Sequence, residues 1–181
     1  MGWLVTAVVV AAAGLGVWLF NRLVSDRNQV GASWSDVDVQ LQRRHDLIPN
    51  LVEIVKGYAG HERTVLERVV AERNAMHEAQ RITDKGAHEP ALKKSLSGLV
   101  ALAEAYPDLK ASTHFMQLSA QLAEVENNLQ YARRFYNGSV RQYNTRRDQF
   151  PDLLVARLFS FQQGEFFAAE ADSRSAPGVM R

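Results

Sequence analysis

The sequence has 181 residues, in which 21 lysines and arginines nearly balance 20 aspartates and glutamates to give a formal net charge of +1. This balance gives no overall electrostatic reason to expect a nucleic-acid partner. Because cysteine is absent, a disulfide framework and a thiolate metal site are both excluded. The length suits one domain and a membrane anchor.

The first element in chain order is an uncharged apolar run over residues 3–20, WLVTAVVVAAAGLGVWLF. At ~1.5 Å per residue, a helix of this run is about long enough to cross a hydrocarbon core of ~30 Å. Trp3 and Trp18 are expected at the membrane interface, where indole rings are favoured, and Arg22 is expected just beyond it. We therefore predict a transmembrane anchor over residues 1–28. The alternatives are a buried core helix and a cleaved signal peptide, but no basic residue precedes the run as a signal peptide normally requires.

Two arginines that follow the run, Arg22 and Arg27, predict the orientation of the anchor. The side preceding the run offers only the amino group. The positive-inside rule therefore predicts an N-terminus outside the membrane and a large domain in the cytoplasm.

Residues 29–171 are expected to form a domain of long amphipathic helices. Residues 30–79 are predicted to form one long amphipathic helix, because apolar residues recur in steps of three and four, as in a coiled-coil seam, with Arg44, Glu62 and Glu72 at positions where the pattern calls for an apolar residue. The apolar residues are Trp34, Val37, Leu41, Ile48, Leu51, Val55, Tyr58, Val65, Val69 and Met76. Pro49 lies inside this pattern and predicts either a kink or the start of a fresh helix. A turn is expected at residues 83–86, where the pattern stops.

Prolines divide the remainder of the predicted domain. Pro90 suits the first turn of a new helix. A second long helix is predicted over residues 108–149, and a last helix over residues 152–169. Because the apolar stripes of these helices cannot stay in water, we predict an all-α antiparallel bundle of long, coiled-coil-like helices behind the anchor. Residues 172–181 are expected to form a disordered tail.

The motifs that carry known chemistry are missing from the sequence. No glutamate is followed by a histidine three residues later, as in di-iron bundles, and His-Glu-x-x-His does not occur. Phosphate-binding loops, the dinucleotide glycine fingerprint and the Gly-x-Ser-x-Gly elbow are also absent. The sequence therefore predicts a protein that is not an enzyme and that has no catalytic residues, cofactor or metal.

Two polar clusters stand out as candidate sites. They comprise Arg43, Arg44, Asp46 and Asn50 in the first, and Asn127, Arg133, Arg134, Tyr136, Asn137, Tyr143 and Asn144 in the second. They are interpreted either as a solvated face whose hydrogen bonds fix helix register or as a protein interface, where Arg, Tyr and Asn are favoured. Arg44 lies on the apolar seam, so its burial would require a carboxylate. Candidates by position are Glu62, Glu72, Glu124 and Glu126.

The segments that contain these clusters also resemble a known family. Residues 32–62, ASWSDVDVQLQRRHDLIPNLVEIVKGYAGHE, and residues 127–151, NNLQYARRFYNGSVRQYNTRRDQFP, are similar to the hallmark segments of the bacterial LemA family, as is LLVARLFSF at 153–161. The resemblance implies a single-pass membrane protein with a short N-terminus outside, a cytoplasmic helical domain and no established enzymatic activity. Because related proteins occur in magnetosome membranes, it also points toward membrane organisation.

Two functions follow as hypotheses. The first is a structural or scaffolding protein of the bacterial inner membrane, with lipid and further copies of itself as partners. The second is an accessory or adaptor subunit that binds another envelope protein, such as a protease or a sensor. No nucleic-acid partner is expected.

Overall fold

A computed structural model describes residues 1–167, which contain helices and no strand. The helices are α1 (Gly2–Tyr58), α2 (Arg63–Glu78), α3 (Ile82–Glu104), α4 (Pro107–Lys110), α5 (Thr113–Asp148) and α6 (Asp152–Leu158). The predicted all-α class is confirmed. The predicted tail at residues 172–181 lies outside the described residues.

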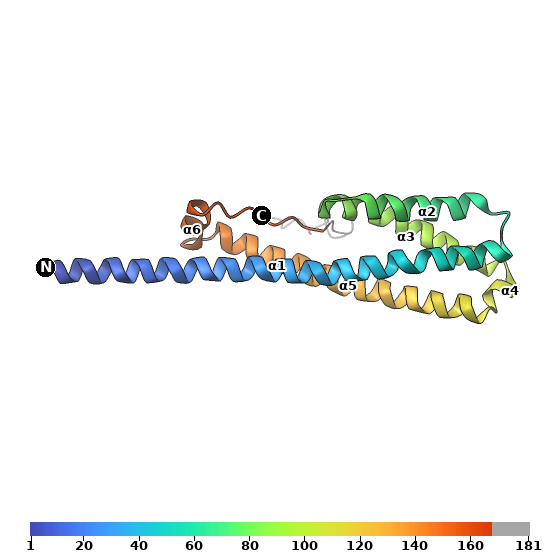
Figure 1. Ribbon diagram of the computed structural model, residues 1–181, viewed down its shortest axis with the longest axis horizontal. Helices are drawn as coiled ribbons and strands as arrows, with labels where there is room; N and C mark the ends of the chain where they lie inside the picture. The colour runs from blue at the N-terminus through green and yellow to red at the C-terminus, as the bar shows by residue number, and fades with distance from the viewer. Residues whose placement is uncertain (168–181) are drawn as a thin grey trace, which may run out of the picture.

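Helix α1 is the axis of the molecule (Figure 1). Its 57 residues give it a length of about 86 Å at ~1.5 Å per residue. Helix α5 packs along it in the opposite direction, and α2 pairs with α3 at the end of the bundle far from the N-terminus. The short helix α6 packs against both α1 and α5 at the other end.

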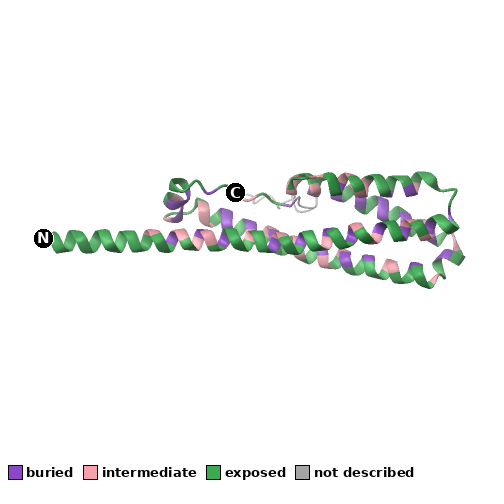
Figure 2. Cartoon of the chain, in the orientation of Figure 1, coloured by how far each residue is buried: buried purple, intermediate pink, exposed green. Residues whose placement is uncertain are grey.

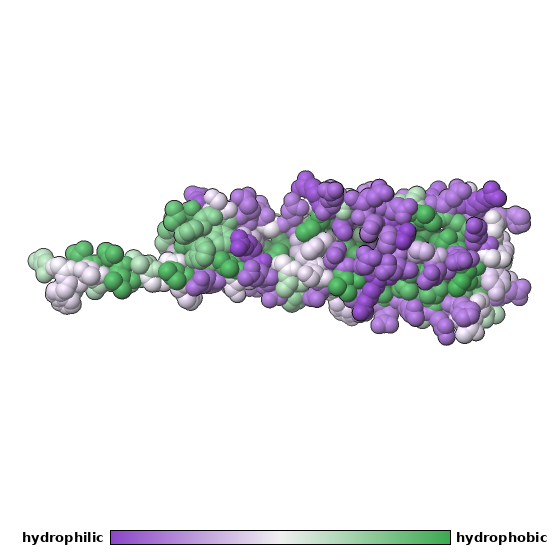
Figure 3. All heavy atoms as spheres, in the orientation of Figure 1, coloured by the Kyte–Doolittle hydropathy of each residue, from purple (hydrophilic) through white to green (hydrophobic). Residues whose placement is uncertain are grey.

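The N-terminal third of α1 projects beyond the bundle (Figures 1 and 2). Apart from the half-buried Gly16, residues 1–18 are exposed, and they form an apolar rod in Figure 3. Within the described residues, α1 holds the one segment that is long and apolar enough to cross a membrane. The predicted anchor and the first helix of the bundle are therefore one uninterrupted helix, α1.

The predicted apolar stripes form most of the core. The main cluster joins residues of α1, α2, α3 and α5, including the fully buried Val37, Ile48, Val69, Leu99 and Leu129. Tyr58 is the member of the first stripe that stays exposed. A second cluster at the anchor end contains Leu19, Leu23, Tyr143, Val155, Ala156 and Phe161.

The predicted single helix over residues 30–79 is wrong, because the chain breaks between α1 and α2 at residues 59–62. Two glycines, Gly57 and Gly60, weaken the helix at this point. A Cβ at Gly60 would lie only 3.0 Å from the carbonyl oxygen of Lys56, so the turn favours a residue without a side chain at this position. By contrast, α1 continues through Pro49, and no fresh helix starts there.

The predicted turn at residues 83–86 is also wrong, since these residues and Pro90 lie inside α3. Asp84 in the first turn favours helix formation there, because the positive end of the helix dipole attracts a carboxylate. Lys85 forms an ion pair of 3.5 Å with Asp38 of α1, and Gly86 is buried. Tertiary contacts thus override the low helix propensity of glycine.

The predicted last helix over residues 152–169 ends instead at Leu158. Ser160 adopts a left-handed φ of 54°, which cannot continue a helix. The amides of Phe161 and Ser160 donate to the carbonyls of Ala156 and Arg157 at 2.9 and 3.3 Å. This is the Schellman arrangement that closes many helices, and it turns the chain back along α5.

Candidate functional site

The most buried charged group in the described part of the chain is Arg44, whose exposed fraction is 1%. Its guanidinium donates two hydrogen bonds to the carboxylate of Glu89 in α3, at 2.8 and 2.7 Å. A third hydrogen bond of 3.0 Å reaches Glu126 in α5, and Met76 Sδ in α2 lies 3.0 Å from Nη2. One side chain of α1 therefore contacts all three other long helices.

Charged groups of both signs lie around Arg44. Arg133 of α5 lies 3.3 Å from the same Glu89 carboxylate, so two arginines face two glutamates. Burial alone would lower the pKa of Arg44 and raise that of Glu89, but their mutual hydrogen bonds and charges reverse both effects. The pKa of Arg44 is raised and that of Glu89 is lowered, so both groups are charged at neutral pH.

Of the four glutamates proposed for Arg44 from the sequence, Glu126 is a partner in the structure. The principal partner, Glu89, is not in that set, because the sequence pattern predicts a turn and a helix start around it and so does not place it on a helix face. Its position on the buried face of α3 is the signal that would have found it, once α3 is extended to Ile82.

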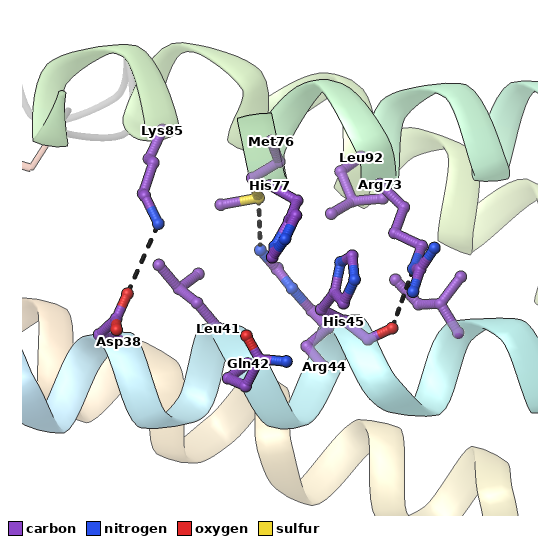
Figure 4. Close-up of a pocket in the computed structure, with 11 residues that line it drawn as sticks. Asp38, Leu41, Gln42, Arg44, His45, Arg73, Met76, His77, Lys85 and Leu92 are labelled. Carbon is purple, nitrogen blue, oxygen red and sulfur yellow. Dashed lines mark hydrogen bonds and ion pairs between the residues drawn. The ribbon is translucent and has the colours of Figure 1, made fainter. Parts of the chain in front are cut away.

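A small cavity of about 30 Å³ lies beside Arg44 between α1, α2 and α3 (Figure 4). His45 stacks on His77 across it, with ring centroids 4.2 Å apart. Arg73 Nε donates to the carbonyl oxygen of His45 at 3.0 Å. Burial, with the charge of Arg73, lowers the pKa of His45. At this size, the cavity has room for about one water molecule and for no substrate.

A second arrangement joins α5 to residues 161–167, which we call the strap. Asn144 Nδ2 donates to the Gly164 carbonyl at 3.0 Å, while its Oδ1 accepts the Gly164 amide at 2.8 Å. Asn137 makes the same pair of bonds with Phe167, at 3.1 and 3.0 Å. Each carboxamide therefore satisfies both backbone groups of one strap residue, as a neighbouring β-strand would.

The tyrosines before these asparagines repeat the pattern. Tyr143 Oη donates to the Gln162 carbonyl at 2.7 Å, and Tyr136 Oη donates to the Glu165 carbonyl at 2.6 Å. Burial, with the charge of Glu165, raises the pKa of Tyr136 to about 12, so its hydroxyl remains a donor. Burial likewise raises the pKa of Tyr143.

The spacing of the two Tyr-Asn pairs explains how one helix holds an extended segment. Seven helical residues rise ~10.5 Å, whereas three extended residues span ~10 Å. The pairs at 136–137 and 143–144 are seven residues apart, and their targets are three residues apart in the strap, from 162 to 165 and from 164 to 167. The two lengths match, so regularly spaced side chains of α5 can bond to the backbone of the strap.

Aromatic side chains close the ends of the strap. Phe167 is fully buried, with its ring centroid 6.2 Å from that of Trp34 and the Arg133 guanidinium 5.3 Å from its ring. Phe161, at the anchor end, is buried against Phe20. Arg133 contacts both Glu89 and Phe167, so it links the strap to the Arg44 network.

The structure separates the predicted site residues into two groups. Arg44 and Arg133 enter the charge network, and Tyr136, Asn137, Tyr143 and Asn144 hold the strap. The exposed remainder is Arg43, Asp46, Asn50, Asn127 and Arg134, which join neither arrangement. Asp46 accepts a hydrogen bond from Gln42 at 2.9 Å on the surface of α1.

Of the predicted membrane-interface residues, Trp3 and Trp18 lie on the projecting part of α1, and Arg22 lies just beyond it against α6. Trp3 and Trp18 are exposed, and the Arg22 guanidinium lies 5.1 Å from the Trp18 ring. Two ion pairs that the sequence did not indicate hold this end together. Asp152 of α6 lies 3.8 Å from Arg22, and buried Asp26 contacts Arg146 of α5.

These arrangements position chains and align helices. Within residues 1–167, no group of three or more histidines, aspartates or glutamates is placed to hold a metal ion. Together with the apolar projecting helix, the fold defines a membrane-associated helical protein.

The chain belongs to the LemA family, whose sequence profile matches residues 33–180. Among characterised relatives it is similar to magnetosome protein MamQ of Magnetospirillum gryphiswaldense, at 22% identity over 82% of this chain and 64% of that protein. Magnetosome protein MamQ 2 of Paramagnetospirillum magneticum is 23% identical over 88% of this chain and 68% of its own length. Protein LemA of Metamycoplasma hominis is 23% identical over 85% of this chain and 71% of its length. The chain thus spans slightly less than two thirds of the first relative.

Proposed function

We propose that this protein is a structural scaffold of the bacterial inner membrane, which assembles with copies of itself to organise the membrane. The observation that carries the proposal is the continuity of α1 from the projecting apolar segment to the end of the bundle. Family membership and two relatives named as magnetosome proteins support a role at membranes.

Continuity of α1 has a mechanical consequence. Leu4 and Val10 are exposed on the projecting segment, and Val37 and Ile48 of the same helix are buried in the bundle. No flexible linker separates anchor and domain, because residues 2–58 are one helix. A force or contact on the bundle is therefore transmitted to the membrane-spanning segment, which is what a scaffold requires.

A groove between α3 and α5 supports self-association. It has a volume of about 600 Å³, and Leu96, Val100 and Leu122 contribute its apolar lining. Val100 is 43% exposed at this groove. Since apolar grooves between helices commonly accept a further helix, we propose that a second copy occupies it.

The proposed topology places the N-terminus outside and the bundle in the cytoplasm. Basic residues from distant parts of the sequence support it, because Arg146 and Arg157 join Arg22 at the anchor end of the bundle. Five arginines and three aspartates lie within residues 22–27 and 146–157. This excess of positive charge favours the cytoplasmic side.

Cysteine crosslinking in native membranes tests the assembly. The chain has no cysteine, so Val100→Cys would introduce a single reactive group at the groove. We expect disulfide-linked dimers of Val100→Cys, and few for Glu124→Cys, an exposed position of α5 outside the groove. Imaging of the same membranes should then show clusters.

Two results would contradict the scaffold. One is a strict monomer in detergent at every concentration, with no crosslinked dimer in membranes. The other is a stoichiometric adduct with a different envelope protein, which would favour the adaptor hypothesis instead.

A further inference from the structure

The face of α6 that points away from the bundle is unusually apolar. Its large side chains are Leu154 and Leu158, which are 60% and 76% exposed, and Phe150 and Phe159, which flank the helix, are 80% and 56% exposed. Leu154 and Leu158 are four residues apart in α6, so they lie on the same side of the helix. In Figure 3 the apolar surface gathers over α6, at the end of the bundle nearest the projecting segment.

The opposite face of α6 is well packed, so the exposure of the outer face does not result from a poorly packed helix. Asp152, Val155 and Ala156 are buried against the second core cluster. Helix α6 thus already packs its inner face against the bundle, and its outer side, with the flanking Phe150 and Phe159, exposes four further large apolar groups. A soluble domain would normally place polar residues on such an outer face.

The position of α6 along α1 fixes what lies around this face. The ring of Phe159 is 4.8 Å from that of Phe20, the last residue of the uncharged run. A hydrocarbon core of ~30 Å corresponds to about 20 helical residues, so a core that begins at Trp3 ends close to Leu23. Leu23 is in the cluster that α6 covers. Any membrane that encloses the run therefore reaches the level of α6.

Charges beside the apolar face match a lipid headgroup layer. Arg157 is exposed on α6 itself, and Arg27 lies 5.4 Å from the ring of Phe161. Arg22 is half-buried between Trp18 and Asp152. Arginines around exposed Leu and Phe side chains are the composition of helices that lie in a membrane interface.

We propose that α6 with its flanking phenylalanines is a second membrane contact, which inserts its apolar face at the headgroup–acyl boundary of the leaflet where α1 leaves the membrane. The contact needs α1 to span the membrane and does not depend on self-assembly. It holds the bundle at two points rather than one, so the bundle axis has a fixed tilt and rotation at the surface. It also wedges apolar volume into one leaflet only.

Spin labels on single cysteines in the full-length chain test this contact directly. Labels at Leu154→Cys and Leu158→Cys in nanodiscs with anionic lipid would be compared for collision with oxygen, which enriches in lipid, and with a nickel chelate, which stays in water. Val10→Cys in the projecting segment serves as the lipid standard. Met116→Cys is the matched control, because Met116 is apolar and 51% exposed at the far end of α5.

We expect the oxygen-to-nickel collision ratio at Leu154 and Leu158 to be several-fold higher than at Met116 and to approach that at Val10. A water-like ratio at Leu158 with a lipid-like ratio at Val10 would overturn the inference and leave the anchor intact. Shielding from both reagents, with spin coupling between chains, would also overturn it, because a second copy would then cover the face.

A double variant tests whether the apolar side chains hold α6 in the interface. Leu154→Ser with Leu158→Ser removes two exposed groups, and circular dichroism should show unchanged helix content. In this background, a label at Phe150→Cys should lose its lipid-like ratio. Retention of that ratio would contradict the role assigned to the apolar face.

Discussion

Arg44 and Glu89 lie 45 residues apart in the sequence but share two hydrogen bonds of 2.8 and 2.7 Å inside the bundle. The side chains are 1% and 7% exposed. Burial of two charges costs about as much free energy as their attraction supplies, so such a pair contributes little net stability. We infer that the pair fixes the alignment of α1 and α3, because only one register of the two helices brings the Arg44 guanidinium and the Glu89 carboxylate together.

Removal of one partner should destabilise the bundle strongly. Arg44→Met removes both hydrogen bonds that Arg44 donates to buried Glu89 and leaves Arg133, 3.3 Å away, as its ion-pair partner, and the expected loss in the free energy of unfolding is about 3 kcal/mol. Urea denaturation of the detergent-solubilised chain, followed by circular dichroism, measures it. The exposed neighbour provides the control, since Arg43→Met should change stability by less than about 0.5 kcal/mol.

The same pair predicts how replacement of both partners behaves. Arg44→Met combined with Glu89→Leu removes both charges, so most of the stability lost in Arg44→Met should return. Equal losses of unfolding free energy in the single and double variants would show that the absence of the Arg44 side chain, rather than the carboxylate of Glu89 left behind, causes the destabilisation.

Acid should weaken the bundle through Glu89. Its pKa in the folded chain is below the ordinary value of 4.5, despite burial, because of the hydrogen bonds and charge of Arg44. The unfolded chain therefore binds more protons as the pH falls, and the stability due to Glu89 is full above about pH 4.5 and is lost as the pH falls through the lower folded pKa. Urea midpoints between pH 7 and pH 3 should fall less steeply in the Arg44→Met, Glu89→Leu variant. Parallel acid profiles would exclude Glu89 as the responsible group.

How far the sequence predicts this structure differs between its elements. The all-α class and the seams through Val37, Ile48 and Leu129 follow from periodicity, and the apolar segment follows from its length and lack of charge. Asn137 and Asn144 could be singled out by their composition, but their role could not. Their partners are backbone atoms of the strap, which carry no sequence signal and lie in a segment where the sequence pattern predicts a helix.

Two other features escaped prediction for a related reason. The helix at residues 83–86 depends on contacts such as Lys85 with Asp38, which lie far apart in the chain. Glu89 was overlooked as the partner of Arg44 because its face is defined only once that helix is placed. Local propensity describes a segment in isolation, and tertiary contacts decide these two cases.

Loss of one of the α5 side chains that bond to the strap should loosen the strap. Asn144→Ala removes both hydrogen bonds to Gly164, so the half-buried amide and carbonyl of Gly164 lose their partners at a cost of about 1 kcal/mol. Amide hydrogen exchange by mass spectrometry should show faster exchange in residues 162–167, and the rest of α5 should remain protected. Asn127→Ala, at an exposed position of the same helix, is the control. Unchanged strap protection in Asn144→Ala would mean that the remaining contacts, from Tyr136, Asn137, Tyr143 and the aromatic ends, hold the strap without Asn144.

The turn that starts the strap gives a prediction in which one chemical change has opposite effects at two sites. Ser160 holds a left-handed φ of 54°, which costs an L-residue about 1 kcal/mol more than glycine. Ser160→Gly should therefore stabilise the chain by about 0.5–1 kcal/mol. Ser97→Gly, at an exposed position inside α3, should destabilise it by a few tenths of a kcal/mol, since glycine is the poorer helix former. Thermal melts of the two variants beside the parent chain measure both signs. A melting temperature that falls in both would show that the Ser160 side chain, rather than its backbone conformation, matters for the return of the chain along α5.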